Sequence, residues 1–167
     1  MSRMAGADNL VSPHGHSSER RGTVTVELAI ILPVILFLLF SILEMGFMIK
    51  NRAELGQAAR EAARLGAVGS TPARMNEGVN SSLSGIPAND VVRSYEHRQW
   101  DEETGAWGDW TQLGVNGTEN DANASDQIRV KLEYDHGLLV PGLMAPVLNA
   151  DDDGNVHLSA ASVMMRE

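Results

Sequence analysis

A single carboxylate, Glu27, stands at the head of the most hydrophobic stretch of the chain, five residues after Gly22. The basic pair Arg20 and Arg21 comes directly before that glycine. A charged side chain deep in a bilayer costs about 3 kcal/mol, so it usually has a partner. If the peptide bond after Gly22 were cut, Thr23 would carry a new amino group. In a helical array of such chains, that amine could neutralise Glu27 of a neighbouring chain.

A second candidate for chemistry is an acidic run near the C-terminus. Asn149, Asp151 and Asp153 fall at positions 1, 3 and 5 of a calcium-binding loop, and Gly154 falls at position 6. Position 12 would be Ala160, so the bidentate glutamate of such a loop is missing, and the following residues are typical of a strand. An Asp-Gly turn explains the run without a metal. We expect neither a bound metal here nor a cofactor elsewhere.

Other arrangements of reactive residues are missing from the sequence. The five histidines share no metal-ligand spacing, there is no phosphate-binding glycine loop, and no Ser/His/Asp set stands out. The chain has no cysteine, which excludes disulfides, thiolate metal sites and cysteine nucleophiles. We therefore expect a protein that is not an enzyme.

The hydrophobic stretch itself indicates a membrane span. Residues 28–43 carry no charge, and the apolar run extends over residues 24–49. At about 1.5 Å per residue this helix would be roughly 39 Å long, enough to cross a hydrocarbon core of about 30 Å. A buried helix of a soluble protein would need a larger partner core than this chain provides. A cleaved secretory signal would need a small-residue cleavage site, and none follows promptly.

The distribution of charge excludes some partners but leaves the orientation of the span open. Arginines precede the span, and Lys and Arg residues also follow it closely, so the positive-inside rule does not decide. The first fifty residues hold four basic and four acidic side chains, so the whole net charge of -9 falls on the remainder. An acidic domain of this kind is repelled by phosphate, which argues against nucleic-acid binding.

The sequence around the span resembles the TadE-like family of pseudopilins, type IV pilin-like proteins of tight-adherence (Flp-type) pilus systems. The matching positions are Arg20, Arg21 and Gly22, residues 26–29 (Val-Glu-Leu-Ala), Leu32 and Pro33, and an acidic, glycine-bearing close at residues 42–46. Flp-type major pilins are very short and carry tyrosine after the glutamate, whereas here Leu28 follows Glu27 and a large domain is attached. This departure favours a minor pseudopilin over the main fibre subunit.

The resemblance implies that a prepilin peptidase at the cytoplasmic face cuts between Gly22 and Thr23, with Glu27 as the recognition residue. It implies a cytoplasmic leader that ends in Arg20 and Arg21, and a C-terminal domain outside the cytoplasmic (inner) membrane. The implied partners are the peptidase and other pilin-like subunits or pilus assembly proteins, reached through the span within membrane lipid. Without the resemblance, Glu27 would simply lie at an interfacial helix start and stabilise the helix dipole.

Beyond the span, residues 50–69 favour an amphipathic helical stem. Small residues cluster on one side, while Glu61 and Arg64 on the other side can pair at i,i+3. Gly66, Gly69 and Pro72 are expected to end the helix. The small-residue face suits close packing on the chain's own domain or on a neighbouring subunit, and we expect the former.

The remaining residues, 70–167, predict a small antiparallel sheet. Alternating apolar residues mark the clearest strand at 127–134, and a closing strand follows at 156–165. Two runs of β-type residues at 91–100 and 106–113 predict a hairpin.

Before the first of these strands we expect a short helix around residues 74–83, and between the strands a mobile polar segment at 114–125 and an apolar connection at 137–148. The aromatic residues of the hairpin could form a stacking platform for sugars or bases, but cross-strand packing is the commoner arrangement and is expected here. These aromatic residues are Tyr95, Trp100, Trp107 and Trp110.

These features predict an α+β, pilin-like fold with a long N-terminal transmembrane helix, an amphipathic stem and a small antiparallel sheet. The expected organisation is a cleaved leader at 1–22, a transmembrane helix at 23–49, the stem at 50–69 and an extracytoplasmic acidic domain at 70–167. The expected function is a non-enzymatic minor pseudopilin that takes part in assembling a tight-adherence pilus or a related secretion apparatus. The alternative is an unprocessed, signal-anchored protein whose outer domain binds a ligand or cell-wall component.

Overall fold

The structure, a computed structural model, describes residues 17–167, with side chains from Val24 onward. The chain divides into two compact units after Leu39. The described part of the first unit is the N-terminal portion of one helix. The second unit, Phe40–Glu167, holds the rest of that helix and all of the remaining elements.

Helix α1, Ser17–Ala67, contains the apolar run and the stem without interruption. Pro33 lies inside this helix. Because proline has no backbone N–H, the Ala29 carbonyl does not receive its usual intrahelical hydrogen bond. The helix ends in a Schellman motif, in which Gly69 has a φ of +89° and the Ser70 amide donates to the Leu65 carbonyl at 3.0 Å. Glycine is required there because other residues rarely adopt positive φ.

The sheet of the second unit has four antiparallel strands in the order β4-β1-β7-β8. The central strand β7 pairs with β8 along its whole length, from Gln127 opposite Met165 to Gly137 opposite Asn155. The strands are β1 (Val91–Arg98), β4 (Thr111–Gln112), β7 (Gln127–Gly137) and β8 (Asn155–Met165). The sequence predicted the two longest of them, and the α+β fold class with a long N-terminal apolar helix is confirmed.

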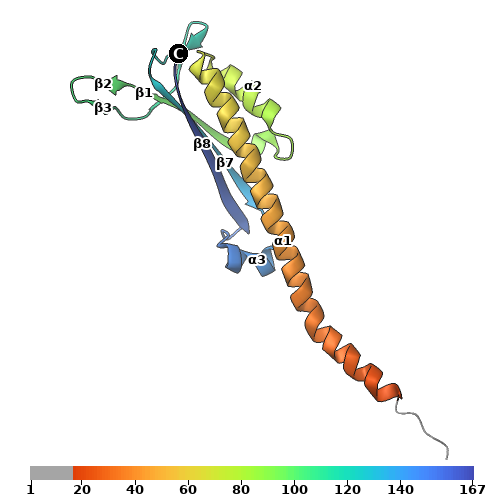
Figure 1. Ribbon diagram of the computed structural model, residues 1–167. Coiled ribbons are helices and arrows are strands. Elements are labelled where there is room, and N and C mark those ends of the chain that lie inside the picture. Colours follow the sequence, from red (N-terminus) through yellow and green to blue (C-terminus); the bar gives the residue numbers. More distant parts are fainter. Residues whose placement is uncertain (1–16) are drawn as a thin grey trace, which may run out of the picture. The chain divides into compact units, whose positions relative to one another are not determined.

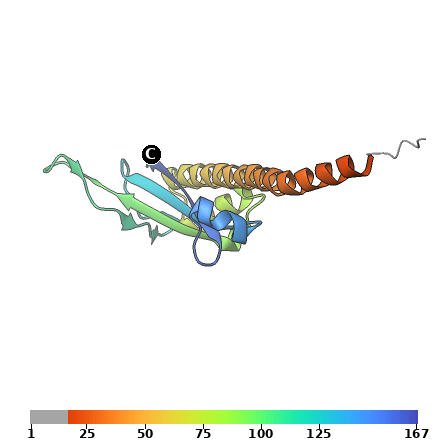
Figure 2. The ribbon, with the colours of Figure 1, turned by 90° about the horizontal axis from the view of Figure 1, so that it is seen from below.

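The core lies between one face of this sheet and the C-terminal half of α1 (Figures 1 and 2). Alternate residues of β7 are fully buried, as the period-two pattern predicted. Helix α2, Pro72–Ser82, adds Met75 and Val79 to the core. The small-residue face of α1 packs on the chain's own domain, as expected. Of the residues that were expected to form it, Ala58, Ala59, Ala62 and Ala63 are fully buried and Leu65 is partly buried; Leu55, one turn earlier, is fully buried as well.

The predicted hairpin is present, and two of its four aromatic residues, Trp100 and Trp107, pack on each other. Strands β2 (Trp100–Asp101) and β3 (Ala106–Trp107) pair at its tip, with the rings of Trp100 and Trp107 edge to face at 5.3 Å. The Trp110 ring lies under the guanidinium of Arg129, 4.1 Å from its centroid. Within residues 24–167, this packing confirms the cross-strand arrangement over an open stacking platform.

Residues 114–125, expected to be a mobile polar segment, instead form a short hairpin of β5 (Val115–Asn116) and β6 (Glu119–Asn120). Asn120 is buried, and its side-chain amide donates to the carbonyls of Gly66 and Ser70 at 2.8 and 3.0 Å. The last carbonyls of a helix have no intrahelical donor, and a polar loop can donate hydrogen bonds to them. The polar side chain of Asn120 in this segment thus supplies hydrogen bonds to carbonyls at the end of α1.

Residues 137–148 contain a helix that the sequence reading missed. Helix α3, Pro141–Leu148, starts with proline in its first turn and ends at Asn149, which adopts the left-handed conformation at φ 52°. Proline is well tolerated in the first turn of a helix, and asparagine can adopt the left-handed conformation that often follows the last turn. The proline and asparagine residues that suggested a loop are therefore also compatible with a short helix. A 3-10 turn, η1 (Ala88–Asp90), precedes β1.

Candidate functional site

The apolar part of α1 is not covered by any part of the chain that the structure describes. An 18-residue window in Val24–Ala67 reaches a mean hydropathy of 2.8, and none of that window is buried. Exposed fractions of 63% for Val24 and 69% for Ile30 are typical of it. The core helix of a soluble protein would be covered by the rest of the chain. The helix is long and apolar enough to cross a bilayer, and it is compatible with single-pass membrane anchoring.

Glu27 lies on this uncovered helix, between exposed Val26 and Leu28. Within residues 24–167, whose side chains the structure describes, no Lys, Arg or His pairs with it. The backbone of Gly22 and Thr23 belongs to the same helix, so Gly22 is about 7.5 Å from Glu27 along the helix axis. A carboxylate in such surroundings would find its counter-charge outside the described part of its own chain.

Several predicted site residues lie outside the part of the chain that the structure describes in full. The side chains of Arg20, Arg21 and Thr23 lie outside the described residues, as does the leader up to residue 16. Cleavage after Gly22 therefore stays a prediction from the sequence.

A second glutamate of α1, Glu44, is buried, with only 1% of its surface exposed. Its two carboxylate oxygens accept hydrogen bonds from His136 Nε2 and from the Leu139 amide, both at 3.0 Å. The other ring nitrogen of His136, Nδ1, lies 3.2 Å from Asn51 Nδ2, so the imidazole links Glu44 to Asn51. The network joins α1 to the end of β7. The sequence reading treated Glu44 only as the acidic close of the span.

Glu54, ten residues after Glu44 on α1, binds a second loop to the same helix. Its Oε1 accepts from the amides of Ser84 and Gly85, the latter at 2.6 Å, and Lys50 Nζ lies 3.6 Å from Oε2. Burial works to raise the pKa of Glu54, but the two amides and Lys50 together outweigh it, so its pKa lies below the ordinary value. Both buried carboxylates of α1, Glu44 and Glu54, thus bind loop amides and hold the domain to the helix.

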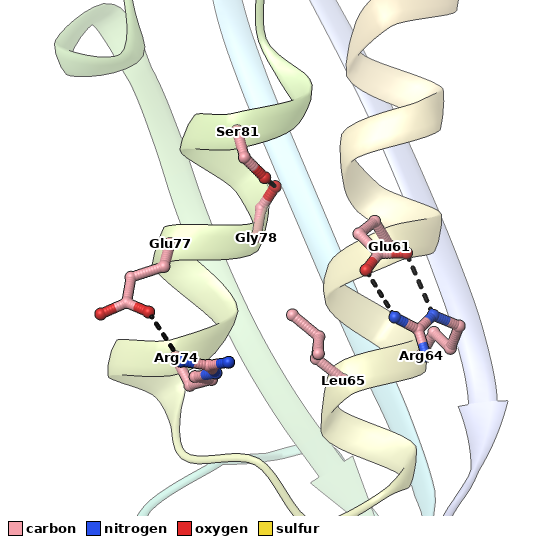
Figure 3. Close-up of a pocket in the computed structure, with 7 residues that line it drawn as sticks. All are labelled: Glu61, Arg64, Leu65, Arg74, Glu77, Gly78 and Ser81. Carbon is pink, nitrogen blue, oxygen red and sulfur yellow. Dashed lines mark hydrogen bonds and ion pairs between the residues drawn. The ribbon is translucent and has the colours of Figure 1, made fainter.

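A groove of about 360 Å³ runs between the C-terminal part of α1 and α2 (Figure 3). Glu61 and Arg64 pair at 2.7 Å on α1, as predicted, and Arg74 pairs with Glu77 at 3.3 Å on α2. The bonded guanidinium of Arg64 lowers the pKa of Glu61. Each ion pair stays within one helix, and Leu65 fills the space beside Gly78. These exposed, mutually satisfied charges form an ordinary solvated surface.

The acidic run near the C-terminus forms a turn. The Asp151 carboxylate accepts from the amides of Asp153 and Asn155, at 3.1 and 2.7 Å, and Gly154 has a φ of +80°. These bonds make an Asx-type turn that accounts for the Asp-Gly pattern. In the part of the chain that the structure describes, no three His, Cys, Asp or Glu residues are grouped to hold a metal ion.

The comparison with protein families gives one match, to the family described as TadE-like protein, over residues 22–64. That segment runs from Gly22 through the uncovered part of α1 into the stem. It contains the residues on which the resemblance rests from Gly22 onward, whereas Arg20 and Arg21 precede it, and the resemblance is confirmed over this segment. No curated protein and no solved structure matches the chain.

Proposed function

We propose that this chain, TadE-like over residues 22–64, is a minor pseudopilin that is cut after Gly22 and assembles through the uncovered part of α1. The family match indicates a role in tight-adherence (Flp-type) pilus assembly. TadE-like proteins are pilus-assembly components and are not known to be enzymes. The finer role, as a minor subunit of the pilus or of a related secretion apparatus, is our proposal.

One observation carries the proposal: Glu27 is an exposed carboxylate at the head of an uncovered apolar helix, and the family match begins at Gly22, five residues before it. Lipid would cover such a helix in the membrane, and neighbouring helices would cover it in an assembly. Burying the charge of Glu27 among lipid chains or apolar helices without a counter-charge would be unfavourable. The amino group of Thr23, created by cleavage in a neighbouring subunit, would supply that charge.

In this proposal the prepilin peptidase cuts on the cytoplasmic side of the inner membrane, and residues 44–167 lie on the other side. Because the domain buries Glu44, we assign the membrane-crossing part to residues 24–43 and not to the longer run that ends at residue 49. About 20 helical residues suffice for a core of about 30 Å. Other pilin-like subunits or pilus assembly proteins would be met within the bilayer.

Replacing Glu27 with alanine separates assembly from insertion. We expect the Glu27→Ala chain to insert in the membrane. It should still be cleaved, because Gly22 and the basic pair before it remain, although the loss of Glu27 as a recognition residue would slow the cut. It should fail to associate with other subunits, because the register-setting charge is gone. Crosslinking of subunits in intact membranes measures the association, and the mobility of the mature chain on a gel measures the cleavage. Glu77→Ala removes an exposed carboxylate from α2 and is the matched control. Normal association of Glu27→Ala would refute the assigned role.

A further inference from the structure

Helix α3 presents apolar side chains to the outside of a strongly acidic domain. Leu139, Leu143 and Val147 have exposed fractions of 57%, 43% and 63%, although all three are aliphatic. Leu143 and Val147 are four residues apart and so share one face of α3, while Met144 is buried on the other side. Residues 137–150 contain no charged side chain.

This helix is attached to α1 at the end of the apolar run (Figure 1). Ser41 Oγ donates to the sulfur of Met144 at 3.6 Å, and the Leu139 amide donates to Glu44 at 3.0 Å. Apolar residues of α1 next to these contacts are themselves exposed, including Leu43 and Phe47. The outer face of α3 therefore continues an apolar surface that already belongs to α1.

Counting along α1 gives the depth at which α3 is attached. Ser41 is the eighteenth residue from Val24, and an α-helix needs about 20 residues to cross the hydrocarbon core. Lys50 and Arg52, the first basic residues after the span, follow within about three turns and are exposed. Contacts at residues 41–44 thus correspond to the level at which hydrocarbon gives way to headgroups.

We infer that α3 lies in the outer interface of the lipid bilayer, with Leu139, Leu143 and Val147 among the upper acyl chains. An eight-residue helix is about 12 Å long and cannot cross a membrane, but it can lie along its surface. Asp151, Asp152 and Asp153 follow it directly and stay in water, which keeps the insertion shallow. The inference rests on α1 as the membrane anchor of the proposed function.

A second copy of this chain fits the same face less well than lipid does. A stable protein–protein interface buries about 800 Å² on each partner. Three partly exposed aliphatic side chains provide much less than that area. The domain's net negative charge also opposes the close approach of another acidic domain.

Because the chain has no cysteine, single-cysteine nitroxide labels can measure this depth in the full-length protein. The protein is reconstituted in phosphatidylcholine vesicles, and the collision rates of each label with oxygen and with a water-soluble nickel chelate are compared. Val147→Cys is the test position. Val115→Cys, on the β5–β6 hairpin and exposed to 59%, is the aqueous control, and Leu36→Cys is the control within the span. We expect the oxygen-to-nickel ratio at Val147 to exceed that at Val115 several-fold.

Three results would overturn the inference, each in a different way. A Val147 label as open to nickel as the Val115 label, with Leu36 in lipid, would show that α3 is in water while the anchor stands. A label shielded from both reagents, increasingly so at higher protein-to-lipid ratio, would show that a second copy covers α3. A Leu36 label open to nickel would remove the anchor and the proposed function together.

Discussion

Replacing Glu44 with alanine is expected to lower the free energy of unfolding of the domain by about 3 kcal/mol. Glu44 is 1% exposed and receives hydrogen bonds from His136 and from the Leu139 amide. Removing the carboxylate leaves the buried His136 donor and the partly buried Leu139 amide without an acceptor, and an unsatisfied buried donor is more costly than a missing bond at the surface. The loss should be concentrated where β7 and the start of the α3 segment meet α1.

Denaturant unfolding of the full-length chain in detergent micelles, followed by tryptophan fluorescence, measures this change. Amide hydrogen exchange at Leu139 tests its location, because that amide loses its acceptor. Glu44→Gln retains an acceptor and should cost less than Glu44→Ala. Glu77→Ala, at an exposed position of α2, should change the free energy of unfolding by less than about 0.5 kcal/mol. Equal effects of the two alanine substitutions would show that the Glu44 network does not hold the domain to α1.

Replacing Leu55 with alanine is expected to lower the free energy of unfolding by a similar amount, about 3 kcal/mol. Leu55 lies on the small-residue face of α1 and is fully buried. The substitution removes buried methyl groups and leaves a cavity, because the sheet and α2 cannot close fully around the smaller side chain. The effect should be present in the isolated monomer, since the face packs on the chain's own core.

The same unfolding measurement on monomeric protein checks this prediction. Val68→Ala is the control, because Val68 follows the end of α1 and is 53% exposed. If Leu55→Ala left the monomer's stability unchanged and weakened only its association with other subunits, the small-residue face would be an intersubunit surface instead.

The long-range architecture could be predicted because its signals are local and repeated. The uninterrupted apolar run predicted a helix that its own chain leaves uncovered, and the alanine-rich side of residues 50–69 predicted the packed stem. In β7 the strict alternation around Val130 predicted which face is buried. Each of these patterns extends over several turns or several strand residues, so a single exception does not obscure it.

Partners of single polar residues could not be predicted in the same way. Glu44 and His136 are 92 residues apart in the sequence, and nothing near either residue points to the other. In the sequence Asn120 is an ordinary loop residue, and only the structure shows that its side chain binds the Gly66 carbonyl at the end of α1. Helix α3 is short and begins and ends in residues that also suit loops, so its sequence alone does not distinguish a helix from a loop.

The candidate processing site differs from both cases. Gly22, Thr23 and Glu27 were identified from residue type and spacing, and the family match over residues 22–64 covers all three. The exposure of Glu27 on an uncovered apolar helix agrees with the role proposed for it. Cleavage itself has to be measured on the mature protein, because Gly22 and Thr23 lie in one continuous helix of the uncut chain.

The N-terminal residue of the mature protein tests the central claim most directly. The chain is expressed in cells with a working prepilin peptidase, extracted from the membrane and sequenced from its N-terminus. We expect the sequence to start at Thr23, with the fraction of cleaved chain falling sharply when the peptidase is absent. A membrane-bound chain that still begins at Met1 or Met4 in the presence of the peptidase would contradict processing, and with it the pseudopilin role.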